Sequence, residues 1–175
     1  MNTYTVRPEQ KHEFPLIYAL IKEAFATAKV SNGDEQDFAD RLRVGKGYIP
    51  ELALVVEEGG RLIGHIMLTQ LTLYMDKGES MPILLLAPLS VRLESRCRGL
   101  GAALINESFK RARTLGHAAV FLAGDPAYYG RFSFLAAGTF DICHEPASIP
   151  GQYVLACELY HSALTNKSGI FNFFE

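Results

Sequence analysis

The chain has 175 residues, 49% of them apolar and 21% charged, and its formal net charge is −2. A chain of this length and composition buries one full core without disulfides or a structural metal, so we expect a single domain over residues 1–175. The near-neutral balance gives no sign of nucleic acid or an anionic membrane surface as a partner, and it favours small molecules.

The N-terminal part predicts a short strand followed by two helices. Residues 4–7 alternate polar and apolar side chains, as a half-buried strand does. Apolar side chains then recur at helical spacing from Leu16 to Phe25. A second, shorter helix begins in the acidic segment 34–37 and ends near Gly45. Its pattern rests on three apolar residues: Phe38, Leu42 and Val44.

Two β-rich segments follow and predict a hairpin. Leu52 to Val56 and Leu62 to Tyr74 contain mostly strand-forming residues, and Glu57-Glu58-Gly59-Gly60 between them is a turn sequence. Pro82 to Val91 is an almost unbroken apolar run, typical of a strand that is buried on both faces. We expect that strand at the centre of the sheet.

The middle of the chain predicts a β-α-β unit. Gly99 to Leu115 reads as an amphipathic helix, and Ala118 to Ala123 as another buried strand. Because a helix separates this strand from the one over Pro82–Val91, the two should be parallel neighbours. The apolar stripe of the helix comprises Leu104, Ile105, Phe109 and Ala112.

The C-terminal part predicts short elements. Pro126 to Phe132 is a short helix or turn, and Ala136 to Cys143 and Tyr153 to Leu159 are two closing strands. The aromatic ending, residues 170–174, leaves two alternatives open: a last strand packed on the core, or the contact of a homodimer.

The junction Arg96–Ala102 is the most informative segment, because a buried strand gives way to a helix there through a turn with two glycines. Without a Cβ, Gly99 and Gly101 allow a pyrophosphate to approach the backbone closely. The first turn of a helix adds unpaired N–H groups and a favourable field, and Arg96 and Arg98 add positive charge. The spacing fits neither a P-loop nor the dinucleotide fingerprint. A helix start that binds no ligand is the alternative.

These residues resemble the coenzyme A loop of the GNAT superfamily of acetyltransferases. The family pattern Q/R-x-x-G-x-G/A is met by Arg96, Gly99 and Gly101. In that family the loop follows the fourth strand of a mixed sheet, the place that Pro82–Val91 holds here.

A second segment, Asp125–Phe134, is similar to the family segment in which a tyrosine precedes a Gly-Phe pair by four and five positions. Tyr129 falls on that tyrosine and Phe134 keeps the register, but Ser133 replaces the glycine. The resemblance follows the order of elements over roughly residues 3–160 and is sharp over 85–138.

The resemblance implies an α/β fold, with a central mixed β-sheet of about seven strands flanked by helices. The parallel fourth and fifth strands would splay apart at their carboxyl ends. It also implies acetyl-CoA as the cosubstrate, with its pantetheine arm inserted at the splay along the backbone of Leu89, Ser90 and Val91. The residues that would bind the pyrophosphate are Arg96, Cys97, Arg98, Gly99, Leu100, Gly101 and Ala102.

The resemblance also assigns roles in catalysis. An amide of the Leu89–Val91 segment would hydrogen-bond the thioester oxygen as negative charge develops during attack by the amine. Tyr129 would protonate the coenzyme A thiolate as a general acid; the alternative is that Tyr128 and Tyr129 are packing aromatics. The resemblance does not identify the general base. Three residues are candidates, and each could instead be a surface charge or a hydrogen-bonded structural residue: Glu35, His65 and Glu158.

Cysteine and histidine placement argues against other chemistries. The three cysteines form no C-x-x-C pair and no even set, so we expect a reducing cytoplasm. Cys97 is either a reactive thiol at the helix start or a residue whose backbone amide alone matters. Five scattered histidines lack metal-ligand spacing, so no metal is expected.

The chain begins with no apolar signal core, and its longest apolar stretch, Ile83–Leu89, is too short to cross a bilayer.

Three functions are compatible with these features. The leading hypothesis is an N-acetyltransferase that moves an acetyl group from acetyl-CoA directly to the primary amine of a small molecule or peptide. The second is a non-catalytic sensor that binds acyl-CoA in a GNAT fold, against which the presence of Tyr129 counts. The third is a toxin-like acetyltransferase acting on aminoacyl-tRNA. That activity should require a basic face, and a net charge of −2 argues against it.

Overall fold

The computed structural model describes residues 4–28 and 31–174. The chain divides into two compact units. Unit 1 comprises the residues up to Thr69 together with Ala87–Arg111, and unit 2 comprises Gln70–Leu86 together with the residues from Ala112 onward. No helix within the described residues is both long enough and apolar enough to cross a membrane.

Unit 1 is built on antiparallel strands. β1 (Tyr4–Pro8) pairs with β2 (Tyr48–Glu58), and β2 pairs with β3 (Arg61–Met75). In the second pair Val55 lies opposite His65. The predicted first strand and the predicted hairpin are therefore confirmed.

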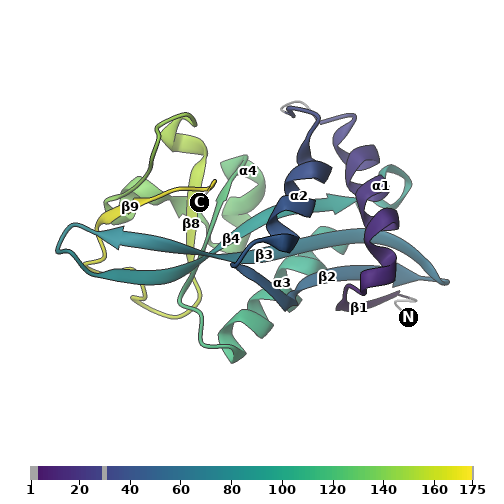
Figure 1. Cartoon of the computed structure of the whole chain (residues 1–175), viewed down its shortest axis with the longest axis horizontal. Helices are drawn as coiled ribbons and strands as arrows, with labels where there is room; N and C mark the ends of the chain where they lie inside the picture. The colour runs from purple at the N-terminus through teal and green to yellow at the C-terminus, as the bar shows by residue number, and fades with distance from the viewer. Residues whose placement is uncertain (1–3, 29–30, 175) are drawn as a thin grey trace. The chain divides into compact units, whose positions relative to one another are not determined.

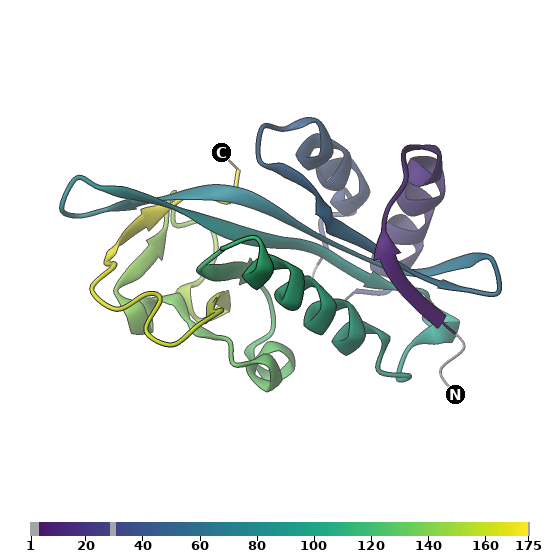
Figure 2. The same ribbon diagram turned by 90° about the horizontal axis from the view of Figure 1, so that it is seen from below.

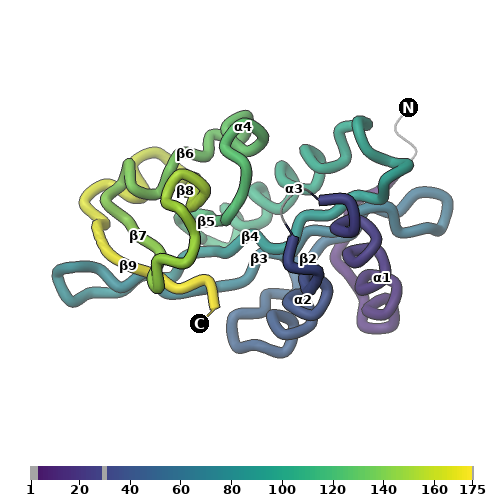
Figure 3. Tube along the Cα trace, turned by 90° about the horizontal axis from the view of Figure 1, so that it is seen from above, coloured from purple at the N-terminus to yellow at the C-terminus, as the bar shows by residue number. Residues whose placement is uncertain are grey.

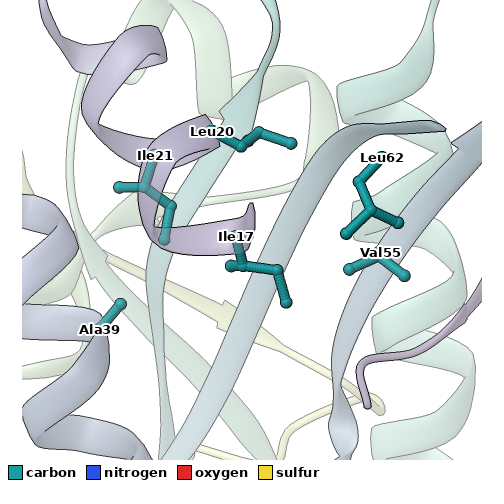
Figure 4. Packing of buried hydrophobic residues seen from close by; sticks show 6 residues of the cluster. All are labelled: Ile17, Leu20, Ile21, Ala39, Val55 and Leu62. Atoms are coloured by element: carbon teal, nitrogen blue, oxygen red, sulfur yellow. The ribbon is translucent and has the colours of Figure 1, made fainter. Parts of the chain in front are cut away.

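Two helices connect β1 to β2, namely α1 (Phe14–Phe25) and α2 (Glu35–Val44). Figure 1 shows them beside each other, and Figure 2 shows both on one face of the strands of unit 1, with α3 (Leu100–Thr114) on the opposite face. Apolar side chains of α1 recur at helical spacing and pack on α2 and the hairpin. Figure 4 shows the members of this cluster: Ile17, Leu20, Ile21, Ala39, Val55 and Leu62.

The buried face of α2 is not the one its apolar residues suggested. The helix itself is confirmed, but Val44 is 88% exposed and Phe38 is only partly buried. The side chains that point inward recur at helical spacing and are mostly polar. They are Gln36, Ala39 and Arg43.

α3 packs closely on β3 at Gly64. A Cβ on Gly64 would lie 3.2 Å from both Leu104 Cδ1 and Val56 Cγ2, and 3.4 Å from the carbonyl oxygen of Ser90. A side chain there would push the helix away from the strands, so glycine permits the approach. The predicted stripe of α3 is confirmed, because no member is more than 5% exposed: Leu104, Ile105, Phe109 and Ala112.

Unit 2 contains the parallel strand pair. β4 (Ser80–Val91) pairs in parallel with β5 (Ala119–Ala123), with Leu84 opposite Val120. β5 also pairs with β8 (Val154–Glu158), in antiparallel orientation. The predicted β-α-β unit is confirmed, as is the predicted closing strand near the position of β8.

Shorter strands complete unit 2. β6 (Leu135–Ala136) pairs with β8, and β7 (Ile142–His144) pairs in parallel with β9 (Gly169–Phe171), beside which it runs in Figure 3. β9 also pairs with the end of β3, where Tyr74 lies opposite Ile170.

The prediction of one strand over Ala136–Cys143 was wrong. A 3-10 turn over Ala137–Phe140 separates β6 from β7, and Asp141 then adopts a left-handed φ of 56°. A left-handed residue breaks the extended backbone that a continuous strand requires. The segment therefore forms two short strands with different partners.

The hydrogen-bonded strand order is β1-β2-β3-β4-β5-β8-β6, which confirms the predicted mixed α/β sheet flanked by helices. The aromatic ending packs within the chain, because Phe171 is 1% exposed and Phe173 is 4% exposed. The remaining helical segments are short. They are α4 (Pro126–Tyr129) and 3-10 turns over Lys11–Glu13, Leu93–Ser95, Gly130–Phe132 and Gly151–Tyr153.

Candidate active site

The turn between β4 and α3 presents its backbone to solvent. Cys97 and Gly99 both adopt left-handed conformations, with φ of 59° and 77°. A Cβ added to Gly99 would meet no atom within 4 Å. Residues 96–99 are exposed, and α3 begins at the next residue, Leu100. The N–H groups of the first turn of α3 thus lie beside open space, an arrangement suited to an anion such as a pyrophosphate.

Both arginines of this turn contact neighbouring elements of unit 1. Arg96 Nη2 donates a hydrogen bond to the carbonyl oxygen of Ala24 at 2.7 Å. Arg98 donates two hydrogen bonds to the carboxylate of Glu58, at 2.6 and 3.0 Å, and this contact raises the pKa of Arg98. A bound phosphate would therefore compete with Glu58 for Arg98.

The predicted pantetheine segment ends β4 and lies in unit 1, as the turn does. Leu89 and Val91 are half-buried, whereas Ser90 is buried. Among the described residues, Ser90 Oγ has no hydrogen-bond partner. The N–H of the next residue, Arg92, donates to the carbonyl oxygen of Ile63 at 3.0 Å, which joins this end of β4 to β3.

Tyr129 ends α4 in unit 2 and is packed from several sides. Its ring lies 4.9 Å from the ring of Tyr128 and 5.6 Å from that of Phe134. Gly124 leaves room for it, since a Cβ there would lie 2.6 Å from Tyr129 Cε2. Burial, with a smaller contribution from Tyr128, raises the pKa of Tyr129. The phenol therefore keeps its proton throughout the neutral pH range, as a general acid must.

Two neighbours of Tyr129 explain how the segment is held. Asp125 caps α4 by accepting a hydrogen bond from the Ala127 N–H at 2.9 Å. Ser133, which stands where the resembling family has glycine, adopts a left-handed φ of 66°. That conformation is the reason glycine suits the position, and Ser133 reaches it without glycine.

A buried polar cluster in unit 1 was not foreseen from the sequence. Its centre is Glu9, just beyond β1, whose carboxylate accepts hydrogen bonds from three side chains. Arg43 donates from Nε at 2.8 Å and from Nη2 at 3.0 Å, and the Tyr48 hydroxyl donates at 2.9 Å. His65 Nε2 lies 2.9 Å from Glu9 Oε2. Neither Glu9 nor His65 has any exposed side-chain surface.

The charges of this cluster are set by burial and by these hydrogen bonds. Burial alone would raise the pKa of Glu9, but hydrogen bonds from His65 and Arg43 lower it to about 2. Burial lowers the pKa of His65 more than the Glu9 carboxylate raises it. Glu9 is therefore ionised and His65 is neutral. A neutral imidazole beside a carboxylate carries its proton on the nitrogen that faces the carboxylate, here Nε2.

The sequence contains one hint of this cluster, the polar residue His65 within an apolar strand, but the hint does not identify the other members. Glu9, Arg43, Tyr48 and His65 are far apart in sequence, so spacing does not connect them. His65 stands in the middle of an apolar strand, where a polar side chain needs a partner. The identity of that partner depends on which face of α2 turns inward, and the apolar residues of α2 did not reveal that face.

The other two candidates for the general base differ from His65. Glu158 Oε1 accepts a hydrogen bond from the Leu164 N–H at 2.7 Å, which is a structural contact. Glu35 Oε1 accepts one from the Asn32 N–H at 3.3 Å, while Glu35 Oε2 is buried without a partner in the described part of the chain. Across residues 4–28 and 31–174, no group of three or more potential metal ligands lies close together.

Comparison with known proteins identifies the family. The acetyltransferase (GNAT) domain model matches residues 5–137. The chain belongs to this GNAT family. Its sequence is 29% identical over 147 residues to the uncharacterized N-acetyltransferase YhbS of Escherichia coli K12, covering 82% of this chain and 81% of YhbS. A second E. coli K12 relative, the uncharacterized N-acetyltransferase YjhQ, is 34% identical over 102 residues, or 57% of this chain and 55% of YjhQ.

Solved GNAT structures share the fold. The crystal structure of E. coli YhbS in complex with CoA superimposes with a TM-score of 0.85 at 26% identity, covering 97% of this chain and 89% of that one. A GNAT acetyltransferase from Brucella melitensis in complex with acetyl-CoA gives a TM-score of 0.73 at 26% identity, covering 93% and 99%. The predicted GNAT fold and the acetyltransferase class are confirmed.

Proposed function

We propose that this GNAT protein is an acetyl-CoA-dependent N-acetyltransferase that moves the acetyl group directly to the primary amine of a small molecule or peptide. The observation that carries the proposal is the exposed left-handed turn at Cys97 and Gly99, which leads straight into the first turn of α3. Relatives with the same fold have been solved with CoA and with acetyl-CoA bound, which supports the same ligand here.

The residues of unit 1 fit the two halves of such a ligand. Arg96, Cys97, Arg98 and the glycine-bearing segment Gly99–Ala102 would hold the pyrophosphate through backbone N–H groups, because no Cβ at Gly99 blocks the approach. Leu89–Val91 would hold the pantetheine arm through its backbone. An N–H of that segment would also stabilise the oxygen of the tetrahedral intermediate, a contribution of about 3 kcal/mol when such a donor is removed in other enzymes.

Proton transfer completes the reaction. Acetyl-CoA supplies an activated acetyl group whose carbonyl carbon the amine nitrogen attacks. When the carbon–sulfur bond breaks, Tyr129 would donate its phenolic proton to the departing sulfur. A tyrosine phenol is protonated at neutral pH, so Tyr129 enters each cycle with the proton that this role requires.

The experiment that tests the proposal follows thiol release from acetyl-CoA in the presence of a set of primary amines, with product masses determined. Direct transfer predicts N-acetylated product, intersecting double-reciprocal plots, and no acetylated protein after incubation with acetyl-CoA alone. An acetyl-enzyme would contradict direct transfer. A protein that binds acetyl-CoA but acetylates no amine would instead be the non-catalytic sensor.

A further inference from the structure

His65 has one ring nitrogen that the described part of the protein does not use. Since Glu9 is ionised and faces Nε2, the proton of the neutral ring lies on Nε2, and Nδ1 is a hydrogen-bond acceptor. This Nδ1 is buried and has no partner among the described residues. A buried acceptor left without a donor has lost its hydrogen bonds to water and carries a free-energy cost. An N–H or O–H group from outside the chain would remove that cost.

Two further polar side chains of unit 1 are in the same condition. Thr69 Oγ1 and Ser90 Oγ are buried, and neither has a hydrogen-bond partner within the residues described. Thr69 lies four positions after His65 on β3, so the two side chains share a face, and it lies opposite Tyr48 of the Glu9 cluster. Ser90 is on the neighbouring strand, with its carbonyl oxygen 3.4 Å from the Cβ position of Gly64.

This face of the sheet is the one opposite α3. Gly64 points toward Leu104 of α3, so the next residue, His65, points the other way. Val55, which lies opposite His65, packs with Ile17 of α1. The hydrogen bond from the Arg92 N–H to the Ile63 carbonyl oxygen sets a register in which Ser90 lies opposite His65, on the same face. The three unpartnered groups therefore belong to the face that α1 and α2 cover in Figure 2.

We propose that His65 is the catalytic base that accepts the proton of the attacking amine at Nδ1, and that Glu9 is the positioning residue that fixes its tautomer. This inference rests on the proposed acetyl transfer. Ser90, and Thr69 about 13 Å along β3 from His65, would form hydrogen bonds with other groups of the same molecule. The ligand class is accordingly a primary amine whose neighbouring atoms carry hydrogen-bonding groups.

The step balances without any further reactant. The amine nitrogen forms a bond to the thioester carbonyl carbon and gives up one proton, which Nδ1 takes. The carbon–sulfur bond breaks, and the sulfur leaves with the electron pair and is protonated. His65 then returns its proton to solvent. The Glu9 carboxylate stabilises the transient imidazolium, as the carboxylate of a catalytic triad does.

The charged and titratable groups around the ring suit this role. Glu9 faces it from the end of β1, Arg43 approaches Glu9 from α2, and the Tyr48 hydroxyl does so from β2. Asp40 pairs with Arg43 on the side away from Glu9. Burial, and to a smaller extent Arg43, opposes a lasting positive charge on His65, so the ring is neutral at rest and gives up its proton after each cycle.

The first test measures turnover with acetyl-CoA and ethanolamine, whose hydroxyl group lies beside the amine, as the probe nucleophile across pH. Removal of a general base typically lowers the rate by about 10²–10⁴-fold. We expect His65→Gln to lower kcat within that range and to abolish the acidic limb of the pH profile, with acetyl-CoA affinity unchanged. Glu9→Gln should lower kcat less and shift that limb. The matched control is His161→Gln, an exposed histidine in unit 2, which should behave as the parent does.

The second test does not depend on any variant of the buried cluster. In ¹⁵N NMR spectra of the parent, His65 should show a protonated Nε2 and an unprotonated Nδ1, and ethanolamine added with CoA should shift the Nδ1 signal of His65 alone. A protonated Nδ1 in the resting protein, an unmoved signal, or unchanged kcat in His65→Gln would each overturn the inference. A parent that binds acetyl-CoA but never turns over would overturn it too, whereas failure to bind acetyl-CoA would contradict the proposed function itself.

Discussion

Glu9 Oε2 lies 2.9 Å from His65 Nε2, and both side chains are wholly buried although the residues are 56 positions apart. The pair joins the end of β1 to the middle of β3. Arg43 brings α2 to the same carboxylate. Tyr48 adds β2, so one buried negative charge holds together four elements of unit 1, and the stability of that unit should depend on it.

Replacing Glu9 by glutamine should lower the free energy of unfolding substantially. The variant keeps the shape of the side chain but leaves the buried Arg43 guanidinium with only the half-exposed carboxylate of Asp40. Breaking a buried ion pair by removing one partner costs about 3–5 kcal/mol. Urea unfolding followed by circular dichroism measures the change.

The matched control is Glu94→Gln, which removes a carboxylate from an exposed pair. Glu94 lies 2.9 Å from Arg61, and their side chains are 50% and 61% exposed. Such pairs contribute less than about 1 kcal/mol. Equal losses in Glu9→Gln and Glu94→Gln would contradict the importance we assign to the buried cluster.

Acid should destabilise the protein through His65. Its pKa is lowered by folding from an unfolded value of 6.5, so its contribution is fully present above pH 6.5 and is lost as the pH falls below it. Compared with His65→Gln, the parent should therefore lose more stability between about pH 7.5 and 5.5. Unfolding free energies of both proteins at the two pH values decide the matter. A relative gain by the parent on acidification would mean that His65 is protonated in the folded state.

Most of the fold could be predicted because the elements carry strong local patterns. These local patterns are the apolar run of β4, the helical spacing of the apolar stripe of α3, and the Gly59-Gly60 turn of the hairpin. The split of the segment around Asp141 could not be predicted, because its left-handed backbone follows from the partners of β6 and β7. Local propensity contains no information on such distant pairing.

The candidate site also has one part that the sequence predicted and one part that it did not. The turn around Gly99 lies within one short segment, so its sequence alone predicted a phosphate-binding helix start. The Glu9 cluster is assembled from three strands and a helix, and none of its residues predicts the others. His65 was one of three candidates for the base, and only the fold distinguishes its unpartnered Nδ1 from the structural contact of Glu158.

Tyr129→Phe should lower kcat by about 10²–10⁴-fold and leave acetyl-CoA affinity nearly unchanged, because only the proton donor is removed. Turnover measured with an amine found by the screen, together with calorimetric binding, separates the two quantities. An unchanged rate would remove Tyr129 from the mechanism and leave it as a packing aromatic.

Gly124→Ala should lower kcat in the same direction without altering Tyr129 chemically. The new methyl group would lie 2.6 Å from Tyr129 Cε2, so the ring must move. Gly130→Ala is the control, because its Cβ would meet no atom within 4 Å although it adjoins Tyr129 in sequence. If both variants keep the rate of the parent, the position of the Tyr129 ring does not matter for turnover.

Gly169→Ala should weaken the pairing of β9 with β3. The added Cβ would lie 2.2 Å from the Tyr74 carbonyl oxygen, and backbone cannot yield as a side chain can. Overpacking of this kind costs about 1–3 kcal/mol, and contact with backbone should place the loss at the upper end. Thermal unfolding tests this against Gly151→Ala, where the methyl group would meet nothing within 4 Å. Equal midpoints would show that β9 shifts without loss.

Calorimetric titration of acetyl-CoA into the parent, Gly99→Glu and Gly78→Glu tests the central claim most directly. Both glycines have φ near +80° and open space at the Cβ position, so the two variants carry the same backbone strain and the same new charge. Only Gly99 lies in the proposed pyrophosphate turn. We predict that the parent and Gly78→Glu bind acetyl-CoA and that folded Gly99→Glu does not. No binding by the parent, or equal binding by all three proteins, would contradict the account.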